Sequence, residues 1–344
     1  MNADMPTVLH ICSIKGRGGT GYMAARLCRL LHERGVRVLV GACPDSKMEE
    51  RARAAGIPVI EGLRLRRGFR PVDLWHDVSL LRETVRREQV DIIHTWHSIE
   101  YWTAAAALAD LDARLVRSRG IVTPIKGTVV NTMIHARTAA VHATCKTIFE
   151  NYRAAGFDTG RVRVLYDGVD LTRFTPGGDG VLMRRELEIA PDALVIGCIA
   201  RLEPIKGHCH LFEALRLVRQ ELPGVRLILA GDGSLRKELE ILAANCGVLS
   251  HIRFLGVRKD IPDILNACDC VALASVGSEG SSRGTMEALA AGVPVVATTV
   301  GTLPELVTAD VGAVVAPANP DAMARELVRI LGDTELRTRM AAAA

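Results

Sequence analysis

Apolar residues follow two repeating patterns along the chain. Short continuous apolar runs, such as residues 7–14 and 194–200, predict strands that are buried on both faces of a sheet. Segments with apolar residues three or four positions apart, such as residues 74–88 and 208–220, predict helices. Because strands and helices alternate, the pattern predicts an α/β protein with doubly wound parallel sheets.

The same patterns predict further elements in both halves of the chain. Strands are expected at residues 36–40, 59–60, 91–94, 114–117, 140–144, 162–166, 225–230, 252–255, 270–274, 293–297 and 313–315, and helices at residues 102–109 and 235–246. Residues 174–180 (FTPGGDG) fit neither pattern and predict an interdomain linker. A chain of 344 residues suits two domains, which we place at residues 1–175 and 176–344.

Charge is divided unequally between these halves. Residues 1–175 carry 26 Lys and Arg against 18 Asp and Glu, a net charge of +8, whereas the remainder carries 17 against 21, or −4. We therefore expect an anionic partner to meet the first half. The basic stretch at residues 64–70 (RLRRGFR) predicts contact with an anionic lipid-linked acceptor or the inner membrane surface; an ordinary solvated loop is the alternative.

Composition points to a cytoplasmic protein. No apolar run is as long as a membrane helix and no signal-peptide pattern precedes the first strand, so membrane contact would be peripheral, on the inner face. The nine cysteines are scattered without a C-x-x-C pair, which favours neither a disulfide framework nor a zinc site. We expect no metal and no other cofactor.

Glycines connect the first expected strand to the first expected helix. The segment Gly16-Arg17-Gly18-Gly19-Thr20-Gly21 matches G-x-G-x-x-G, in which glycines let the backbone approach a diphosphate at a helix N-terminus. A dinucleotide site also needs an acidic residue at the end of the second strand, and here the first acid is Asp45. A phosphate or sugar loop that includes Gly18 and Gly19 is therefore favoured, with a purely structural turn as the alternative.

Two cations follow the strand at residues 194–200. Arg201 and Lys206 stand in the loop before the next helix, at the strand end where parallel sheets bind their ligands. Together they can hold both phosphates of a diphosphate and neutralise the charge that builds as a sugar leaves. The alternative is a solvated loop with two ordinary surface charges.

Two carboxylates flank a loop of small residues at residues 279–287 (EGSSRGTME). Gly280, Ser281 and Ser282 leave backbone N–H groups for a phosphate, while Glu279 and Glu287 can accept hydrogen bonds from sugar hydroxyls. In the alternative interpretation Gly284 caps the following helix, so that Glu287 lies at position N3 and supports the helix dipole. Glu279 would then be an ordinary loop acid.

Taken in order, these motifs resemble glycosyltransferase family 4. The similar segments are Arg201-Leu202 to Lys206-Gly207, Gly231-Asp232-Gly233, Phe254-Leu255-Gly256, Glu279 to Glu287 with the apolar stretch after it, and Gly301-Thr302-Leu303-Pro304-Glu305. The resemblance covers nearly the whole chain and is densest in the C-terminal half. It implies the GT-B fold, with two Rossmann-like domains facing across a cleft, and sugar transfer with retention.

The resemblance also implies roles for individual residues. Arg201 and Lys206 would hold the diphosphate of a nucleotide-sugar donor, Glu279 would contact the transferred sugar, and Glu287 would contact the ribose. Further donor contacts are implied for Gly231, Gly233, Leu255, Gly280, Ser281 and Ser282. The departing phosphate would help to take the acceptor's proton, so this route needs neither a strong base nor a metal.

The N-terminal half resembles the family through Gly18-Gly19, the segment at residues 91–94 and the exit segment at residues 166–174. Val116-Arg117-Ser118-Arg119-Gly120 is similar to the branch that assembles lipopolysaccharide and surface polysaccharide, which implies a glycan or lipid-linked acceptor and no nucleic acid. Many members carry a histidine where this chain has Gly120. His94 and His97 are the local substitutes, and we expect His97 in the active site, with a satisfied polar group as the alternative.

Family members usually continue after residues 333–336 with a helix that crosses back to the first domain, and this helix is expected to be missing here. Three other functions share some of the motifs. A nucleotide-sugar epimerase would have the same fold and donor loops, an NAD-dependent oxidoreductase would use the glycine-rich turn, and a noncatalytic module would bind a sugar nucleotide without turning it over.

Overall fold

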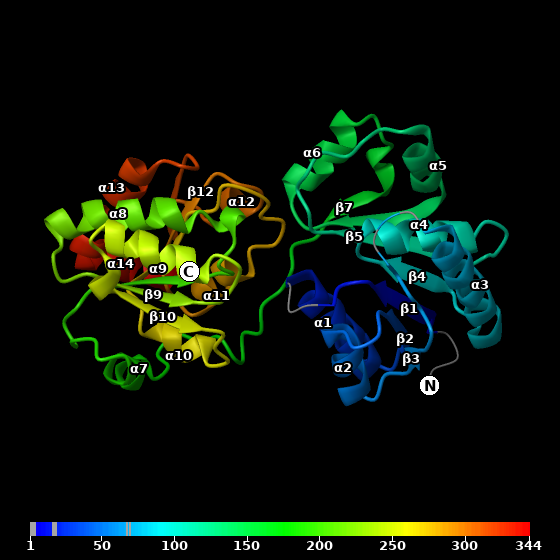
Figure 1. Ribbon diagram of the computed structural model, residues 1–344, viewed down its shortest axis with the longest axis horizontal. Coiled ribbons are helices and arrows are strands. Elements are labelled where there is room, and N and C mark those ends of the chain that lie inside the picture. The colour runs from blue at the N-terminus through cyan, green and yellow to red at the C-terminus, as the bar shows by residue number, and fades with distance from the viewer. Residues whose placement is uncertain (1–4, 16–18, 67, 69) are drawn as a thin grey trace. The chain divides into compact units, whose positions relative to one another are not determined.

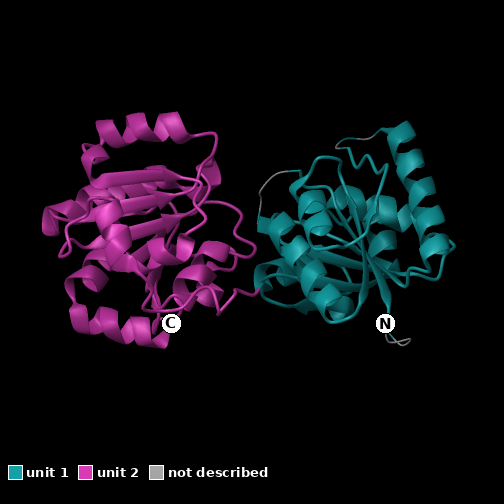
Figure 2. Cartoon of the chain, turned by 90° about the horizontal axis from the view of Figure 1, so that it is seen from below, with its two compact units in different colours: residues 1–167 teal, residues 168–344 magenta. Residues whose placement is uncertain are grey.

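The computed structural model describes residues 5–15, 19–66, 68 and 70–344, and the chain divides into two compact units, residues 1–167 and 168–344 (Figure 2). Each unit is a parallel sheet with helices on its faces, which confirms the predicted fold class (Figure 1). The segment at residues 174–180, predicted as a linker, lies within the second unit, and Phe174 is buried in that unit's core.

The described part of the first unit has one seven-stranded sheet in the order β3-β2-β1-β4-β5-β6-β7. Its strands are β1 (Thr7–Cys12), β2 (Arg37–Ala42), β3 (Val59–Ile60), β4 (Ile92–Thr95), β5 (Arg114–Arg119), β6 (Thr138–Ala143) and β7 (Val162–Val164). Its helices are α1 (Gly19–Glu33), α2 (Lys47–Ala54), α3 (Pro71–Glu88), α4 (Ser98–Ala107), α5 (Val129–Arg137) and α6 (Lys146–Ala154), followed by the short turn η1 (Thr159–Arg161).

Alternate residues of β1 face opposite helical layers. Leu9 and Ile11 pack in a cluster with residues of α3 and α4, whereas Val8 and Cys12 pack in a second cluster with residues of α1 and α2. Side chains of a strand alternate between its faces, so a continuous apolar run is what a sheet covered on both sides requires. The two helix pairs accordingly lie on opposite faces of this sheet (Figure 1).

The second unit has a six-stranded parallel sheet, among the described residues, in the order β10-β9-β8-β11-β12-β13. Its strands are β8 (Val195–Ile199), β9 (Arg226–Ala230), β10 (Ile252–Gly256), β11 (Cys270–Leu273), β12 (Val295–Thr298) and β13 (Gly312–Val315). Its helices are α7 (Gly180–Glu186), α8 (His208–Glu221), α9 (Arg236–Asn245), α10 (Ile261–Asn266), α11 (Arg283–Ala290), α12 (Leu303–Leu306), α13 (Pro320–Gly332) and α14 (Thr334–Ala343), with short turns η2 (Pro204–Lys206) and η3 (Leu249–His251).

Strand order reverses once in each sheet, between β1 and β4 and between β8 and β11. Ligands of doubly wound sheets bind beyond the carboxyl ends of the strands at such a reversal. Arg201 follows β8 and Glu279 follows β11, so the fold brings these two segments to one edge of the sheet. No described helix is long and apolar enough to cross a membrane.

Candidate functional site

The loops after β8 and β9 contact each other through their backbones. The Leu202 N–H donates to the carbonyl of Asp232 at 3.1 Å. A Cβ atom on Gly231 would lie 1.9 Å from the carbonyl oxygen of Ala200, and one on Gly233 would lie 2.4 Å from that of Leu202. Only glycine fits at both positions, so the close approach of the loops accounts for these two predicted site residues independently of any ligand.

A tight turn after β8 directs Lys206 into the site. Gly207 follows η2 in the left-handed conformation, with φ 63°, and a Cβ atom there would lie 2.0 Å from the carbonyl oxygen of Ala274. The Lys206 side chain is only 17% exposed and its Nζ donates a hydrogen bond to Oε1 of Glu279. The structure therefore brings these two predicted site residues into direct contact.

Arg201 stands at the other end of the same loop in a different environment. Its side chain is 58% exposed, and its guanidinium lies 4.0 Å from the carboxylate of Glu203. An ion pair at that distance and exposure holds the side chain weakly. Arg201 is therefore able to turn toward an anion that enters from solvent.

Glu279 is a buried acceptor whose position is fixed from both sides. Its Oε1 accepts hydrogen bonds from Lys206 and, at 2.5 Å, from the hydroxyl of Ser275, whereas no described residue donates to its Oε2. Its backbone carbonyl accepts the N–H of Thr302 at 2.8 Å, and Gly301 packs so closely that a Cβ would lie 2.0 Å from that carbonyl. Glu279 is thus oriented with one carboxylate oxygen still available to a ligand hydroxyl.

The interpretation of Gly284 as a helix cap is wrong. The N-cap of α11 is Ser282, which adopts the left-handed conformation with φ 44°, and the helix begins at Arg283. Gly284 lies within the first turn, where a Cβ atom would sit 2.6 Å from the carbonyl oxygen of Ile199 in β8. Glu287 is therefore the fifth residue of the helix, past the N3 position that a capping carboxylate occupies.

Glu287 is buried although it caps nothing. Its side chain is about 10% exposed, and its Oε1 lies 3.1 Å from Nε of Arg283. Burial raises the pKa of this carboxyl, while Arg283 and Arg173 act in the opposite direction. Burial disfavours the charged form of this carboxylate, and hydrogen bonds from a ligand would favour it. The two hydroxyls of a ribose could donate such bonds.

Two residues at this site were missed from the sequence. His208 is the first residue of α8; it is buried, and neither ring nitrogen bonds to any described residue. Burial first and Lys206 second lower the pKa of His208 to about 4, so it is neutral at pH 7. Ser275 was the other omission, and its signal was a small polar residue directly after a buried strand.

Predicted residues of the first unit lie around the carboxyl ends of β1 and β4. Gly18 is outside the described residues; Gly19 opens α1, and a Cβ atom there would meet nothing within 4 Å. His97 is the N-cap residue of α4, and its backbone N–H donates to the Glu100 carboxylate. His97 and Gly120 line one cavity of about 280 Å³, which we call the upper cavity.

His94, the other local substitute for a catalytic histidine, belongs to the sheet. It is buried, its Nε2 lies 2.8 Å from the hydroxyl of Ser118, and its ring stacks on Trp96 at 4.9 Å. Burial, then the neighbouring His10 and His142, hold its pKa well below the ordinary value. These contacts support the strands, so of the two substitutes His97 is the one that lines the upper cavity.

The basic stretch at residues 64–70 is partly anchored. Asp77 accepts the backbone N–H groups of Arg64 and Leu65, each at 2.9 Å, and Asp73 accepts the Arg64 side chain at 2.7 Å. The Arg66 side chain is mostly exposed. Residues 67 and 69 lie outside the described residues. No three His, Cys, Asp or Glu side chains gather as metal ligands within the described ranges.

Two family models match the chain. Residues 17–173 match the model described as Glycosyltransferase Family 4, and residues 182–344 match the one described as Glycosyl transferases group 1. The two matched segments correspond closely to the two structural units.

Curated relatives carry transferase names. A D-inositol 3-phosphate glycosyltransferase of Salinispora arenicola is 33% identical over 273 residues, which cover 73% of this chain and 58% of that protein. A GDP-mannose-dependent monoacylated alpha-(1-6)-phosphatidylinositol monomannoside mannosyltransferase of Corynebacterium glutamicum is 35% identical over 190 residues, covering 52% of this chain and 49% of the relative. The chain thus spans about half the length of the curated relatives it matches.

Solved structures share the whole fold. Anabaena HepE in complex with UDP and glucose is 26% identical and superposes with a TM-score of 0.84, covering 98% of this chain and 92% of that one. WaaG, a glycosyltransferase involved in lipopolysaccharide biosynthesis, superposes with a TM-score of 0.72 at 16% identity, covering 97% of this chain and 93% of that one, which shows likeness of fold alone.

Proposed function

Since the chain belongs to glycosyltransferase family 4 and has two Rossmann-like units of the GT-B type, we propose that it transfers a sugar from a nucleoside diphosphate sugar to an acceptor hydroxyl, with retention. The observation that carries the proposal is the cluster of Lys206, Glu279 and Ser275 at the strand reversal of the second unit. A buried cation lies here beside a carboxylate whose Oε1 is hydrogen-bonded and whose Oε2 accepts no hydrogen bond from a described residue. This arrangement suits a ligand that is anionic on one side and rich in hydroxyls on the other.

In this proposal the second unit holds the donor. Lys206 and Arg201 bind the diphosphate, the free oxygen of Glu279 accepts from a hydroxyl of the sugar, and Glu287 accepts from the ribose. The α11 loop, from Gly280 to Ser282, offers backbone N–H groups to phosphate or sugar. Gly231, Gly233 and Leu255 border the base.

The reaction needs a stabilised leaving group and a destination for one proton. The bond between the sugar carbon and the diphosphate oxygen breaks, and negative charge grows on that oxygen, where Arg201 and Lys206 oppose it. The acceptor oxygen bonds to the same sugar carbon and its proton passes to the departing diphosphate. The protein then supplies charge and position, and neither a carboxylate nucleophile nor a metal takes part in the proposed route.

We assign the reaction to lipopolysaccharide or other surface-polysaccharide assembly, at the inner face of the membrane. The support is the Arg117-Ser118-Arg119-Gly120 segment and the excess of basic residues in the first half of the chain. A glycan or lipid-linked acceptor suits that assignment, and His97 lines the cavity at the carboxyl end of β4 that would receive it.

The first test is donor turnover by the purified chain. UDP-glucose and GDP-mannose are the probes, because HepE was crystallised with UDP and glucose and a relative is named for GDP-mannose. Release of the nucleoside diphosphate should require Arg201, with kcat/KM about 10- to 100-fold lower in Arg201→Ala. Arg216→Ala, which removes another exposed arginine from the same unit, should leave the rate unchanged.

Two results would contradict transfer, and a third would contradict the role of Arg201. Interconversion of the sugar without release of diphosphate would indicate an epimerase of the same fold. Donor binding without any turnover, with or without glycolipid acceptors, would indicate a noncatalytic module. Wild-type rates in a correctly folded Arg201→Ala would remove this residue from the donor site.

A further inference from the structure

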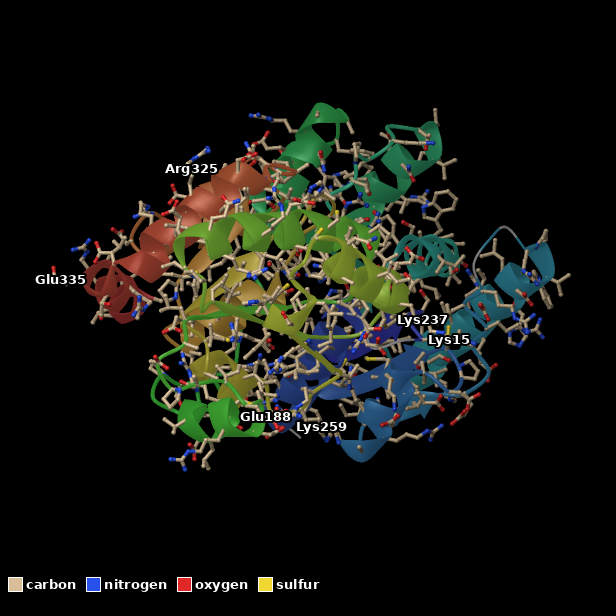
Figure 3. The ribbon with its side chains drawn as sticks, turned by 60° about the vertical axis from the view of Figure 1, so that its left-hand side comes forward. Lys15, Glu188, Lys237, Lys259, Arg325 and Glu335 are labelled. Carbon is tan, nitrogen blue, oxygen red and sulfur yellow. The ribbon has the colours of Figure 1, made fainter. Side chains whose placement is uncertain are left out.

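Strand β5 ends in two arginines that point to the same side of the sheet. Arg117 and Arg119 are two positions apart, so their side chains leave the strand on one face. Arg117 is only 7% exposed and Arg119 is partly buried. Charged side chains ordinarily project outward, as Arg325 of α13 and Glu335 of α14 do (Figure 3), so a buried pair of like charges calls for a physical reason.

Neither guanidinium forms an ion pair with a described residue. Arg117 lies 3.3 Å from the Ser98 hydroxyl through Nη2, and its guanidinium stands over the ring of Tyr101, 4.2 Å from the centroid. Arg119 donates through Nη2 to the carbonyl of Thr123 at 2.7 Å. The Nε atom of each arginine is buried and bonds to no described residue. Each side chain is therefore held in place with donors left over.

This arrangement is unfavourable without a counter-ion. A buried charge is costly unless an opposite charge or a full set of hydrogen bonds compensates it. Burial first and the charge of Arg117 second lower the pKa of Arg119. The two arginines thus repel each other where water is largely excluded, and an anion bound to both would offset the repulsion and the cost of burial.

Two cavities meet at this pair. The upper cavity, about 280 Å³, contains Trp96, His97 and Gly120, and a second cavity of about 230 Å³ contains Lys126 and Trp102. Ser98, Arg117 and Arg119 line both of them, and no acidic side chain lines either. The pair stands at the carboxyl edge of a parallel sheet, where ligands of this fold class bind.

We propose that Arg117 and Arg119 bind a phosphate group and that the acceptor of the transfer reaction is therefore a phosphorylated compound. The second clause rests on the proposed function, whereas the phosphate site stands on the first unit alone. A phosphate monoester carries close to two negative charges and three acceptor oxygens, which match two guanidinium groups better than a single carboxylate does. Lys126 provides a third positive charge in the second cavity, the one of about 230 Å³.

The phosphate could belong to a soluble molecule or to a lipid. An apolar groove of about 660 Å³ lies between α3, α4 and α5 and shares Ser98 with both cavities. Val130 and Met133, both more than half exposed, line this groove. A hydrocarbon chain attached to the bound phosphate could lie in this neighbouring groove, whereas a soluble phosphate ester would leave the groove empty.

Intrinsic fluorescence can report on the first unit alone. The three tryptophans of the chain, Trp75, Trp96 and Trp102, are all in the first unit, and Trp96 and Trp102 line the two cavities. Titration of the full chain with inorganic phosphate, against sodium chloride of equal ionic strength, should give a saturable change. No change beyond that of the chloride would overturn the site.

Variants on the same strand supply the control. Arg117→Gln and Arg119→Gln should each raise the dissociation constant for phosphate by about tenfold or more. The dissociation constant of Arg117→Lys should lie between those of the wild type and Arg117→Gln, because lysine keeps the charge but lacks the forked guanidinium that can bind two phosphate oxygens. Arg114→Gln, at the exposed start of β5, should bind as the wild type does. If Arg117→Gln proves unfolded by circular dichroism, the less buried Arg119→Gln carries the test, and equal affinity in Arg114→Gln and Arg119→Gln overturns the proposal.

The source of the phosphate and the fate of the proposed function are tested separately. Glycerol 3-phosphate and lysophosphatidic acid share a headgroup, so tighter binding of the lipid, weakened by Val130→Asp, identifies a lipid phosphate; equal binding of both identifies a soluble one. Phosphate binding in a chain that never turns over a nucleotide sugar would refute the transferase and leave the site. Turnover of a nucleotide sugar by a chain that does not bind phosphate would refute the phosphate site and leave the proposed transferase function.

Discussion

Lys206 and Glu279 stand 73 residues apart in the sequence and form an ion pair inside the second unit, with side chains 17% and 4% exposed. Lys206 is therefore already partnered before a diphosphate arrives. Ser275 gives Glu279 a second hydrogen bond, so the carboxylate keeps one partner if Lys206 turns toward a phosphate. Lys206 can thus donate to a phosphate while the buried carboxylate of Glu279 keeps its hydrogen bond from Ser275.

The ion pair predicts a stability effect that depends on both partners. Lys206→Met leaves Glu279 buried with only Ser275, and should lower the free energy of unfolding by about 3 kcal/mol. The double variant Lys206→Met with Glu279→Leu should be more stable than Lys206→Met, with a coupling energy of about 1 to 3 kcal/mol. Urea unfolding followed by far-ultraviolet circular dichroism measures both. Additive losses would show that the pair is not coupled.

The two carboxylates should separate in a binding experiment. Glu287→Gln should weaken binding of the bare nucleoside diphosphate about tenfold, because its proposed partner is the ribose. Glu279→Gln should bind the diphosphate at least as tightly as the wild type does, because Lys206 loses its anionic partner, and should lose turnover of the intact donor, because the proposed partner of Glu279 is the sugar. Calorimetric titration with the diphosphate and a turnover assay distinguish the two. Equal loss of diphosphate affinity in both variants would contradict the assignment.

Two glycines should respond to the same substitution in different ways. Gly233→Ala places a methyl group 2.4 Å from the carbonyl oxygen of Leu202 and should lower the melting temperature by several degrees. Gly19→Ala meets open space in the first turn of α1 and should leave the melting temperature unchanged or slightly higher. If the Gly19 backbone approaches the ligand, Gly19→Ala should still reduce turnover. Full activity there would remove Gly19 from the site.

His10 should make the first unit sensitive to acid. It is fully buried in β1, neither ring nitrogen bonds to a described residue, and burial lowers its pKa to about 4 from 6.5. The unfolded chain binds more protons between those values, so this contribution is complete above pH 6.5 and is lost as the pH falls toward 4. Between pH 7 and pH 5 the loss should be about 2 kcal/mol.

The His10→Leu variant should lose less stability over the same interval, measured by urea unfolding followed by tryptophan fluorescence. His32→Gln, which alters an exposed residue of α1, is the matched control and should keep the wild-type dependence on pH. Equal pH dependence in both variants would show that His10 is not the group that titrates.

Much of the fold was predictable because buried parallel strands leave a simple trace in the sequence. The runs that became β1, β8 and β11 are continuous and apolar, and each was placed to within two residues at most of its ends. Arg201, Lys206 and Glu279 could be assigned to the strand ends for the same reason: the loop that follows a buried parallel strand lies at the edge of the sheet where ligands bind.

Other features depend on contacts that no local pattern records. Ser282 rather than Gly284 caps α11, because Gly284 lies against the carbonyl of Ile199, which is more than eighty residues away in the chain. The burial of His208 and the stacking of His94 on Trp96 likewise follow from packing between elements. The sequence marks these residues as polar but not as enclosed.

The loops around the proposed donor site contact one another through main-chain atoms. A Cβ atom added to any of four glycines there would lie within 2.4 Å of a carbonyl oxygen: Gly207, Gly231, Gly233 and Gly301. A wall made of backbone cannot be reshaped by exchanging side chains. Divergence of this scaffold toward a different sugar or base must therefore proceed through the few positions whose side chains face the ligand, or through changes in loop length. The main-chain contacts that fix these loops therefore also limit the routes by which the selectivity of the proposed site can evolve.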